Sequence, residues 1–512
     1  MVIASTHTSN RIGARKAAGD LSNAEKRRKV QTGVDEPKVK AVAKKAPVAK
    51  RGVAAARGKA RAKTSVKART TKKMTPSAEP EATQEAAAPQ KPIAPVAKPF
   101  IKSRTEPVHA LATRATVPGT VHVFGNGDCG QLGLGEDMTE RKKPFPMDSL
   151  DQQIVDVVSG GLHTMALTLE GKLWSWGCND QRALGRSGEE NVPGLVEGLD
   201  GIAITRVACS DSATFALSED GHVYSWGTFR SAEGIMGFSE ETEIQATPAV
   251  INNFREPIVN LCAGVDHALA LSVSGKVYAW GYGQQGQLGR LIMERRRMHG
   301  LTPERIRLQD VHQIGCGSYH SFAITKDGSV YAWGLNNFHQ LGLAPADGGN
   351  AEIVHEPTRV AALKGANIIK IVGGEHHTIA LTAEGKLFSF GRSDSHQTGL
   401  PFATLVQDTE SMQINANSQT TEDASAHKKA INLPTHIESI PSIVDFTCGS
   451  NHNIAVSQDG KAYTWGFGEM LQLGNGEEED IAEPTLLRGQ KIDDKVVSKV
   501  AAGGQHSVVL AA

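Results

Sequence analysis

Long apolar runs are missing from this chain. Nowhere in its 512 residues does a stretch approach the roughly 18 consecutive apolar residues that a membrane-spanning helix needs. The N-terminus, MVIASTHTSN, has neither a continuous apolar core nor the cleavage site of a secretory signal. We therefore expect a soluble, intracellular protein with no membrane partner.

Cysteine is also scarce, and no C-x-x-C pair occurs. The common zinc sites and small disulfide frameworks need such paired spacing, so we expect no metal and a reducing compartment. Four of the cysteines recur in the repeat described below, four or five residues before its His or the residue that replaces the His, where a small apolar core residue fits. The six cysteines are Cys129, Cys178, Cys209, Cys262, Cys316 and Cys448.

Acidic residues are few in residues 1–107, which contain 25 Lys and Arg against 8 Asp and Glu, whereas the remaining residues contain 30 against 47. The segment is also almost without aromatic residues before Phe100. So little apolar surface cannot offset the chain entropy of folding, so we expect residues 1–107 to be a disordered basic tail. One basic run predicts nuclear import through import receptors or contact with DNA phosphates, with a solvated linker as the alternative. It consists of Lys26, Arg27, Arg28 and Lys29.

Two short motifs alternate along residues 108–512. The first is an aromatic strand that ends in Gly, as in LWSWG and VYAWG, at Gly125, Gly177, Gly227, Gly281, Gly334, Gly391 and Gly466. The second is a small-residue turn followed by an apolar strand, at His163, Ala213, His267, His320, His377, His452 and His506. Tight turns with Gly join the second motif to the next copy of the first, which is a strong hairpin signal. Seven units of this kind predict an all-β, seven-bladed β-propeller.

The ends of the array predict how the ring closes. The body begins with an unpartnered aromatic strand, VHVFG, and ends with an unpartnered His strand, GGQHSVVL. Pairing the two would complete the seventh blade and remove exposed sheet edges. The His of each repeat is expected to bond between blades, and the repeated Trp residues are expected in the core. One longer spacing predicts a polar insertion at about 401–430.

Several blade-specific segments resemble the regulator of chromosome condensation family: GNGDCGQLGLG followed by ERKKP, then GCNDQRALGR, and YGQQGQLGR. The likeness runs from about residue 119 to the C-terminus. It implies a nuclear, chromatin-associated guanine-nucleotide exchange factor that promotes GDP release from the small GTPase Ran without bond chemistry and without a cofactor. Roles in nucleocytoplasmic transport, mitotic spindle assembly and the cell cycle follow from the same resemblance. The alternative is a propeller that acts only as an interaction scaffold.

The resemblance also implies site residues. The positions that match the family's Ran-facing residues are Asp128, His163, Asp211, Asp266, His376 and His506, together with the basic Arg230 and Arg290. For Asp211 and Asp266 the alternative is a capped turn. The segment TFRSAEGIMG resembles the family's hairpin wedge, which implies that role for Arg230, Ser231, Ala232, Glu233, Gly234, Ile235, Met236 and Gly237.

A longer loop, RLIMERRRMHG, resembles the family's contact with the acidic patch of the nucleosome histones. Arginine side chains suit paired carboxylates, and a solvated loop is the alternative. The candidates are Arg295, Arg296 and Arg297. The chain departs from its own repeat at Ala213, which replaces the His of the second motif.

Overall fold

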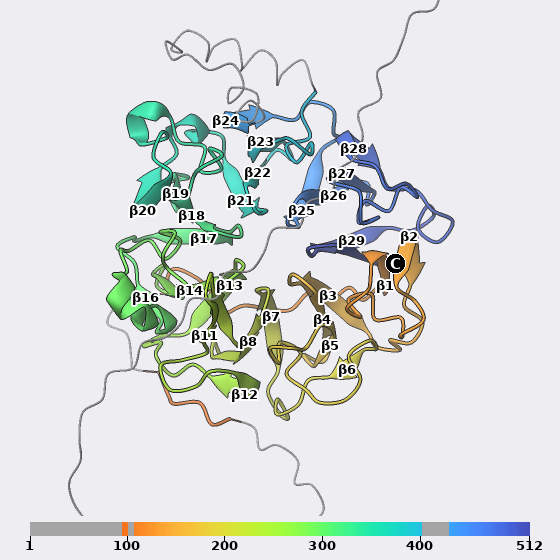
Figure 1. Cartoon of the computed structure of the whole chain (residues 1–512), viewed down its shortest axis with the longest axis horizontal. Coiled ribbons are helices and arrows are strands. Elements are labelled where there is room, and N and C mark those ends of the chain that lie inside the picture. Colours follow the sequence, from red (N-terminus) through yellow and green to blue (C-terminus); the bar gives the residue numbers. More distant parts are fainter. Residues whose placement is uncertain (1–94, 101–106, 402–429) are drawn as a thin grey trace, which may run out of the picture. The chain divides into compact units, whose positions relative to one another are not determined.

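The computed structural model describes residues 95–100, 107–401 and 430–512, all of which belong to one compact unit, Ala86–Ala512 (Figure 1). The expected import or DNA run Lys26–Lys29 lies outside the described residues, as does most of the expected tail. Most of the polar insertion, residues 402–429, lies outside them as well. No helix in the described ranges is long and apolar enough to cross a membrane.

Seven four-stranded antiparallel sheets surround a common centre, as expected for a seven-bladed propeller (Figure 1). In each blade, the strand that lies closest to the centre of the ring is called the inner strand. The seven inner strands are β3 (Ile154–Ser159), β7 (Ile204–Cys209), β13 (Ile258–Ala263), β17 (Val311–Cys316), β21 (Ile368–Gly373), β25 (Ile443–Cys448) and β29 (Val497–Ala502).

The second and third strands of each blade are the two repeated motifs of the sequence. The His motif forms β4 (His163–Thr168), β8 (Ala213–Ser218), β14 (His267–Ser272), β18 (His320–Thr325), β22 (His377–Thr382), β26 (His452–Ser457) and β30 (His506–Ala511). The aromatic motif forms β5 (Leu173–Gly177), β9 (Val223–Gly227), β15 (Val277–Gly281), β19 (Val330–Leu335), β23 (Leu387–Arg392), β27 (Ala462–Gly466) and β1 (Thr120–Asn126).

The outer strands vary more in length. They are β6 (Gly194–Leu195), β12 (Gln245–Val250), β16 (Glu304–Arg305), β20 (Ile353–Arg359), β24 (Ala430–His436), β28 (Ile481–Leu486) and β2 (Glu140–Pro146). One extra hairpin is formed by β10 (Phe229–Ser231) and β11 (Gly234–Gly237). The short 3-10 helices are η1 (Glu294–Leu301), η2 (Pro345–Asp347) and η3 (Ala361–Leu363).

We number the blades 1 to 6 along the chain, from β3–β6 onward, and call the last one the closing blade. The closing blade has the strand order β2-β1-β30-β29, so that the first and last strands of the array lie side by side. Val123 of β1 is registered with Val508 of β30, and Gly125 with His506. The predicted closure of the ring by the two ends of the repeat array is therefore confirmed.

The ring has two faces, which differ in their connections. On the loop face, loops join each inner strand to the next strand, and longer segments lead to the outer strand. On the turn face, tight turns join the second strand to the third, as at Gly171, where φ is +85° and the backbone N–H donates to the Thr168 carbonyl. The N-terminal segment crosses the turn face, since Val108 N–H donates to the Val273 carbonyl and Arg114 Nη1 to the Ile204 carbonyl.

Hydrogen bonds between blades join the repeated His to the hydroxyl or amide at the start of the second strand of the following blade. His163 Nε2 lies 3.0 Å from Thr214 Oγ1, and His506 Nε2 lies 2.8 Å from Thr164 Oγ1. The same bond recurs at His267, His320, His377 and His452. The repeated Trp residues are buried, and Trp176 donates its indole N–H to the Gln131 carbonyl. Both core predictions are confirmed.

Candidate functional site

The loop face carries a rim around the mouth of the central channel, with backbone hydrogen bonds between the loops at six of the seven seams between blades. Backbone hydrogen bonds join the loop of one blade to the loop of the next: Asp211 N–H donates to the Val265 carbonyl, and Ser318 N–H to the Gly374 carbonyl. Similar bonds follow through Ser450 and Gly504. Side chains in these loops are therefore mounted on a rigid platform, although they come from segments far apart in the sequence.

Asp211 and Asp266 lie on adjacent blades of this rim. The Asp266 carboxylate accepts the backbone N–H of Arg230 at 2.6 Å. Burial raises the pKa of Asp266 to about 7, the Arg230 amide opposes the rise, and the charge of Asp211 adds to it. Part of the Asp211 side chain is open to solvent, yet the packed loops around it raise its pKa to about 6, while the charge of Arg230 lowers it.

The rim continues through three residues that sequence reasoning missed: Tyr319, Glu375 and Asn451. Asn451 Nδ2 donates to Glu375 Oε2 at 3.1 Å, and Glu375 Oε1 lies 3.7 Å from His376 Nε2. Burial lowers the pKa of His376, and the charge of Glu375 opposes this. Burial, followed by the charges of Glu375 and Asp211, raises the pKa of Tyr319 to about 12, so its hydroxyl stays protonated. The sequence feature that could have identified all three is their position, one or two residues before the repeated His.

Arg230 to Gly237 form a hairpin that stands where other blades carry the Q-L-G segment. Arg230 pairs with Ile235 and Ser231 with Gly234. At its base, Phe229 is buried and stacks on Phe215, with 5.9 Å between the ring centroids. The hairpin therefore has an apolar anchor as well as the hydrogen bond to Asp266.

This anchor explains why the copy of the His motif in blade 2 has Ala213 where the other copies have His. At the seam between blades 2 and 3, both partners of the usual hydrogen bond are replaced, by Ala213 and Ala268. Both alanines are buried in one apolar cluster with Phe229 and Trp280. The aromatic ring of the hairpin thus replaces the polar bond, so that no buried donor is left without an acceptor at this seam.

The structure separates the eight GTPase-contact candidates. It brings Asp211, Asp266, Arg230 and His376 to the loop face near the channel mouth. Asp128 is exposed on the same face, where Asn126 Nδ2 donates to its carboxylate at 3.2 Å.

Two other candidates, His163 and His506, are not on that surface. Their exposed fractions are 1% and 0%, and burial lowers their pKa values to about 4 and about 3. Both side chains are used in the seams between blades, so direct contact with a partner is not available to them.

Arg290 is also turned inward. Its Nη1 lies 3.2 Å from Glu304 Oε2, and only 18% of the side chain is exposed. Burial lowers the pKa of Arg290, and the charge of Glu304 opposes this. Its visible role is to fasten the short outer strand β16 to the loop before it.

The three loop arginines of η1 have different surroundings. Arg297 Nη1 lies 2.6 Å from Glu233 Oε2 at the tip of the hairpin and 3.1 Å from Glu294 Oε1. Arg295 and Arg296 are exposed, and Arg296 lies at a kink with non-helical backbone angles. The hairpin and the arginine loop are separate segments of the sequence, but in the structure they are joined by the ion pair between Glu233 and Arg297.

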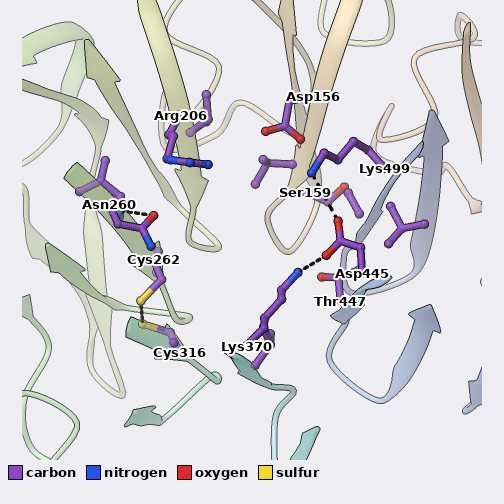
Figure 2. A pocket seen from close by; sticks show the side chains of 18 of the residues that line it. Asp156, Ser159, Arg206, Asn260, Cys262, Cys316, Lys370, Asp445, Thr447 and Lys499 are labelled. Atoms are coloured by element: carbon purple, nitrogen blue, oxygen red, sulfur yellow. Dashed lines mark hydrogen bonds and ion pairs between the residues drawn. The ribbon is translucent and has the colours of Figure 1, made fainter. Parts of the chain in front are cut away.

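The central channel holds a cavity of about 400 Å³ lined by all seven inner strands (Figure 2). The third residue of each inner strand contributes one polar side chain to a ring: Asp156, Arg206, Asn260, Gln313, Lys370, Asp445 and Lys499. Lys370 Nζ lies 2.6 Å and Lys499 Nζ 3.4 Å from the Asp445 carboxylate. Among the described residues, no group of three or more His, Cys, Asp or Glu could hold a metal ion.

Comparison with known proteins gives consistent results. The family model described as the RCC1-like domain matches residues 120–509. The regulator of chromosome condensation of Xenopus laevis is 36% identical over 430 residues, which cover 80% of this chain and 93% of the relative. The guanine nucleotide exchange factor SRM1 of Saccharomyces cerevisiae is 36% identical over 435 residues, with coverage of 76% and 87%.

A solved structure agrees in fold as well as in sequence. The crystal structure of Prp20p from Saccharomyces cerevisiae, described together with its binding to Gsp1p and histones, superposes with a TM-score of 0.74 at 36% sequence identity. The match covers 80% of this chain and 96% of that chain.

Proposed function

The chain belongs to the regulator of chromosome condensation family, and on that basis we propose that it is a guanine-nucleotide exchange factor for the small GTPase Ran. The observation that carries the proposal is the hairpin β10–β11 standing beside the carboxylates of the loop face. A propeller that acted only as a scaffold would need no such irregularity in one blade.

The carboxylates would receive and orient the GTPase. Asp128, Asp211, Asp266 and Glu375 give the loop face a run of acidic side chains across several blades. Complementary charge of this kind speeds association with a basic partner surface and sets its orientation. We assign this role to Asp128, Asp211 and His376 from the resemblance, and we add Tyr319 and Glu375 because they lie on the same rim.

The hairpin would act as the wedge that weakens nucleotide binding. Its base is held by Phe229 and Asp266 and its tip by the Glu233–Arg297 ion pair, whereas Ile235 remains 42% exposed. A rigid element that favours the nucleotide-free GTPase must lower the affinity for nucleotide by the same coupling factor. Exchange then needs no covalent step on the propeller.

Chromatin contact is the second part of the proposal. The related Prp20p is described with binding to histones, and the loop that carries η1 presents arginines to solvent. Because Arg297 is already paired, we assign the contact with the nucleosome acidic patch to Arg295 and Arg296. DNA contact and nuclear import through Lys26, Arg27, Arg28 and Lys29 complete the proposal of a nuclear, chromatin-associated protein.

The test is release of fluorescent GDP from purified Ran with catalytic amounts of the full chain. We expect acceleration, and we expect Ile235→Ala to remove most of it. Ile369→Ala is the matched control, because Ile369 is also exposed, at 51%, but lies at the turn-face end of β21. A folded full chain that does not accelerate release would leave the scaffold alternative. Equal rates for the two variants would contradict the wedge assignment.

A further inference from the structure

Three cysteines occupy the same place in the propeller, the last residue of an inner strand: Cys209 in β7, Cys316 in β17 and Cys448 in β25. Each faces the fifth residue of the inner strand in the preceding blade. Cys209 Sγ lies 4.0 Å from the Val158 carbonyl oxygen, and Cys448 Sγ lies 3.5 Å from the Val372 carbonyl oxygen.

The seam that contains Cys316, between blades 3 and 4, differs from the other two in one respect. There the fifth residue of the preceding inner strand is Cys262, and its Sγ lies 2.7 Å from Cys316 Sγ (Figure 2). The propeller repeat has therefore placed two thiols side by side, although 54 residues separate them in the chain. Nothing in the sequence spacing indicated this pair, because neither cysteine belongs to a C-x-x-C motif.

Both thiols line the cavity of the central channel, which gives a small oxidant a route to them. Cys262 is half-buried and is the more accessible of the two, whereas Cys316 is buried. Burial, followed by the neighbouring Cys262, raises the pKa of the Cys316 thiol well above its usual range. Because the thiolate is the reactive form, Cys316 should react slowly near neutral pH.

We propose that Cys262 and Cys316 are a redox-convertible pair that a peroxide closes into a disulfide between blades 3 and 4. The Cys262 sulfur attacks the peroxide, the O–O bond breaks, and a sulfenic acid and one water form. The Cys316 sulfur then attacks the sulfenic sulfur, the S–S bond forms, and a second water leaves. Two thiols are oxidised by two electrons and one hydrogen peroxide is reduced to two waters, so the step balances.

The bond would join two blades covalently at a seam that otherwise has noncovalent contacts. These include the hydrogen bonds between His267 and Ser321, from Asn260 Nδ2 to Gln313 Oε1, and from the Val265 N–H to the Ser318 carbonyl. A cross-link between distant residues restricts the unfolded chain more than the folded one. The oxidised protein should therefore unfold at a midpoint several degrees higher than the reduced protein, and a dithiol reductant should reverse the shift.

The experiment treats the reduced full chain with hydrogen peroxide, alkylates the remaining thiols and maps the cross-linked peptides by mass spectrometry. We expect loss of two hydrogens, a peptide pair joined through Cys262 and Cys316, and alkylation of the other four of the six cysteines. Oxidation should be faster at alkaline pH. Cys262→Ser should abolish the cross-link, and Cys448→Ser should leave it unchanged.

A gain-of-function variant gives a test that keeps all six native cysteines. Val158→Cys places a thiol opposite Cys209, in the same arrangement as Cys262 opposite Cys316. If the repeat geometry sets the pairing, this variant should lose four hydrogens and form two cross-links. Alkylation of all six native thiols after peroxide treatment, or a cross-link between other cysteines, would overturn the proposal.

Discussion

Replacing Asp266 by asparagine should stabilise the propeller while it weakens exchange. The Asp266 carboxyl is half-buried on the rim of the channel, and burial raises its pKa from 3.8 to about 7. At neutral pH the fold therefore holds a negative charge that it disfavours. Asparagine keeps an oxygen that can accept the Arg230 N–H, and it removes the charge.

The magnitude follows from linkage. The gap between 3.8 and about 7 corresponds to about 4 kcal/mol at about pH 8, at about 1.4 kcal/mol for each unit of pH. A carboxyl whose pKa is raised in the folded state stabilises the fold when it is protonated. This contribution is fully present below pH 3.8, the ordinary pKa, and is lost as the pH rises through about 7, the pKa in the fold. At about pH 5.5 the disadvantage of the charge is therefore smaller, about 2 kcal/mol. The gain in the free energy of unfolding from Asp266→Asn should therefore be smaller at about pH 5.5 than at about pH 8.

The assay is urea unfolding of the full chain and of Asp266→Asn at about pH 8 and about pH 5.5, together with GDP release from Ran at the higher pH. We expect a more stable variant, a smaller gain in acid, and exchange reduced about tenfold, the equivalent of one lost charged interaction. An Asp266→Asn protein no more stable than the parent at about pH 8, or equally favoured at both pH values, would refute the reasoning.

Three further outcomes follow from the same contacts. Thr164→Val should cost about 1 to 3 kcal/mol in urea unfolding, because His506 Nε2 loses its partner inside a seam, and a change below about 0.5 kcal/mol would contradict that role. Phe229→Ala should cost about 3 to 5 kcal/mol, whereas Ile235→Ala should stay within about 0.5 kcal/mol; calorimetric melting compares the two. Catalysed exchange should fall as the pH drops through about 7 and then about 6, where Asp266 and then Asp211 are protonated, and Asp211→Asn should remove the lower step at constant ionic strength.

The paired replacement of Ala213 and Ala268 shows how the chain tolerates an irregular blade. A single substitution of either seam partner would leave a buried polar group without a bond, whereas both changes together leave an apolar gap. Phe229 fills that gap. We infer that the hairpin and the missing His are one feature, since the aromatic ring that secures the hairpin occupies the space the polar bond would need.

Sequence by itself determined the repeat, and with it the propeller. The alternation of strands and the Gly turns such as Gly171 are local, because backbone conformation and the two-residue period of a strand are set by neighbouring residues. The count of seven and the unpartnered ends then determined closure through β1 and β30. The hairpin at Arg230 to Gly237 was also visible, as an irregularity against a regular background.

Only the tertiary structure decided which side chains meet and which are available. Asp266 and Arg230 come from different blades, as do Cys262 and Cys316, and their distances depend on the rotation between blades when the ring closes. The position of each histidine relative to the start of its strand decided whether it reaches the rim or is buried between blades. His376 lies one residue before the buried repeat position and keeps 13% of its side chain exposed on the rim, whereas His163 and His506 occupy that position itself and bond inside the seams. A shift of one residue turns a side chain to another side of the chain, so a histidine reaches the rim at one position and is a buried bond between blades at the position after it.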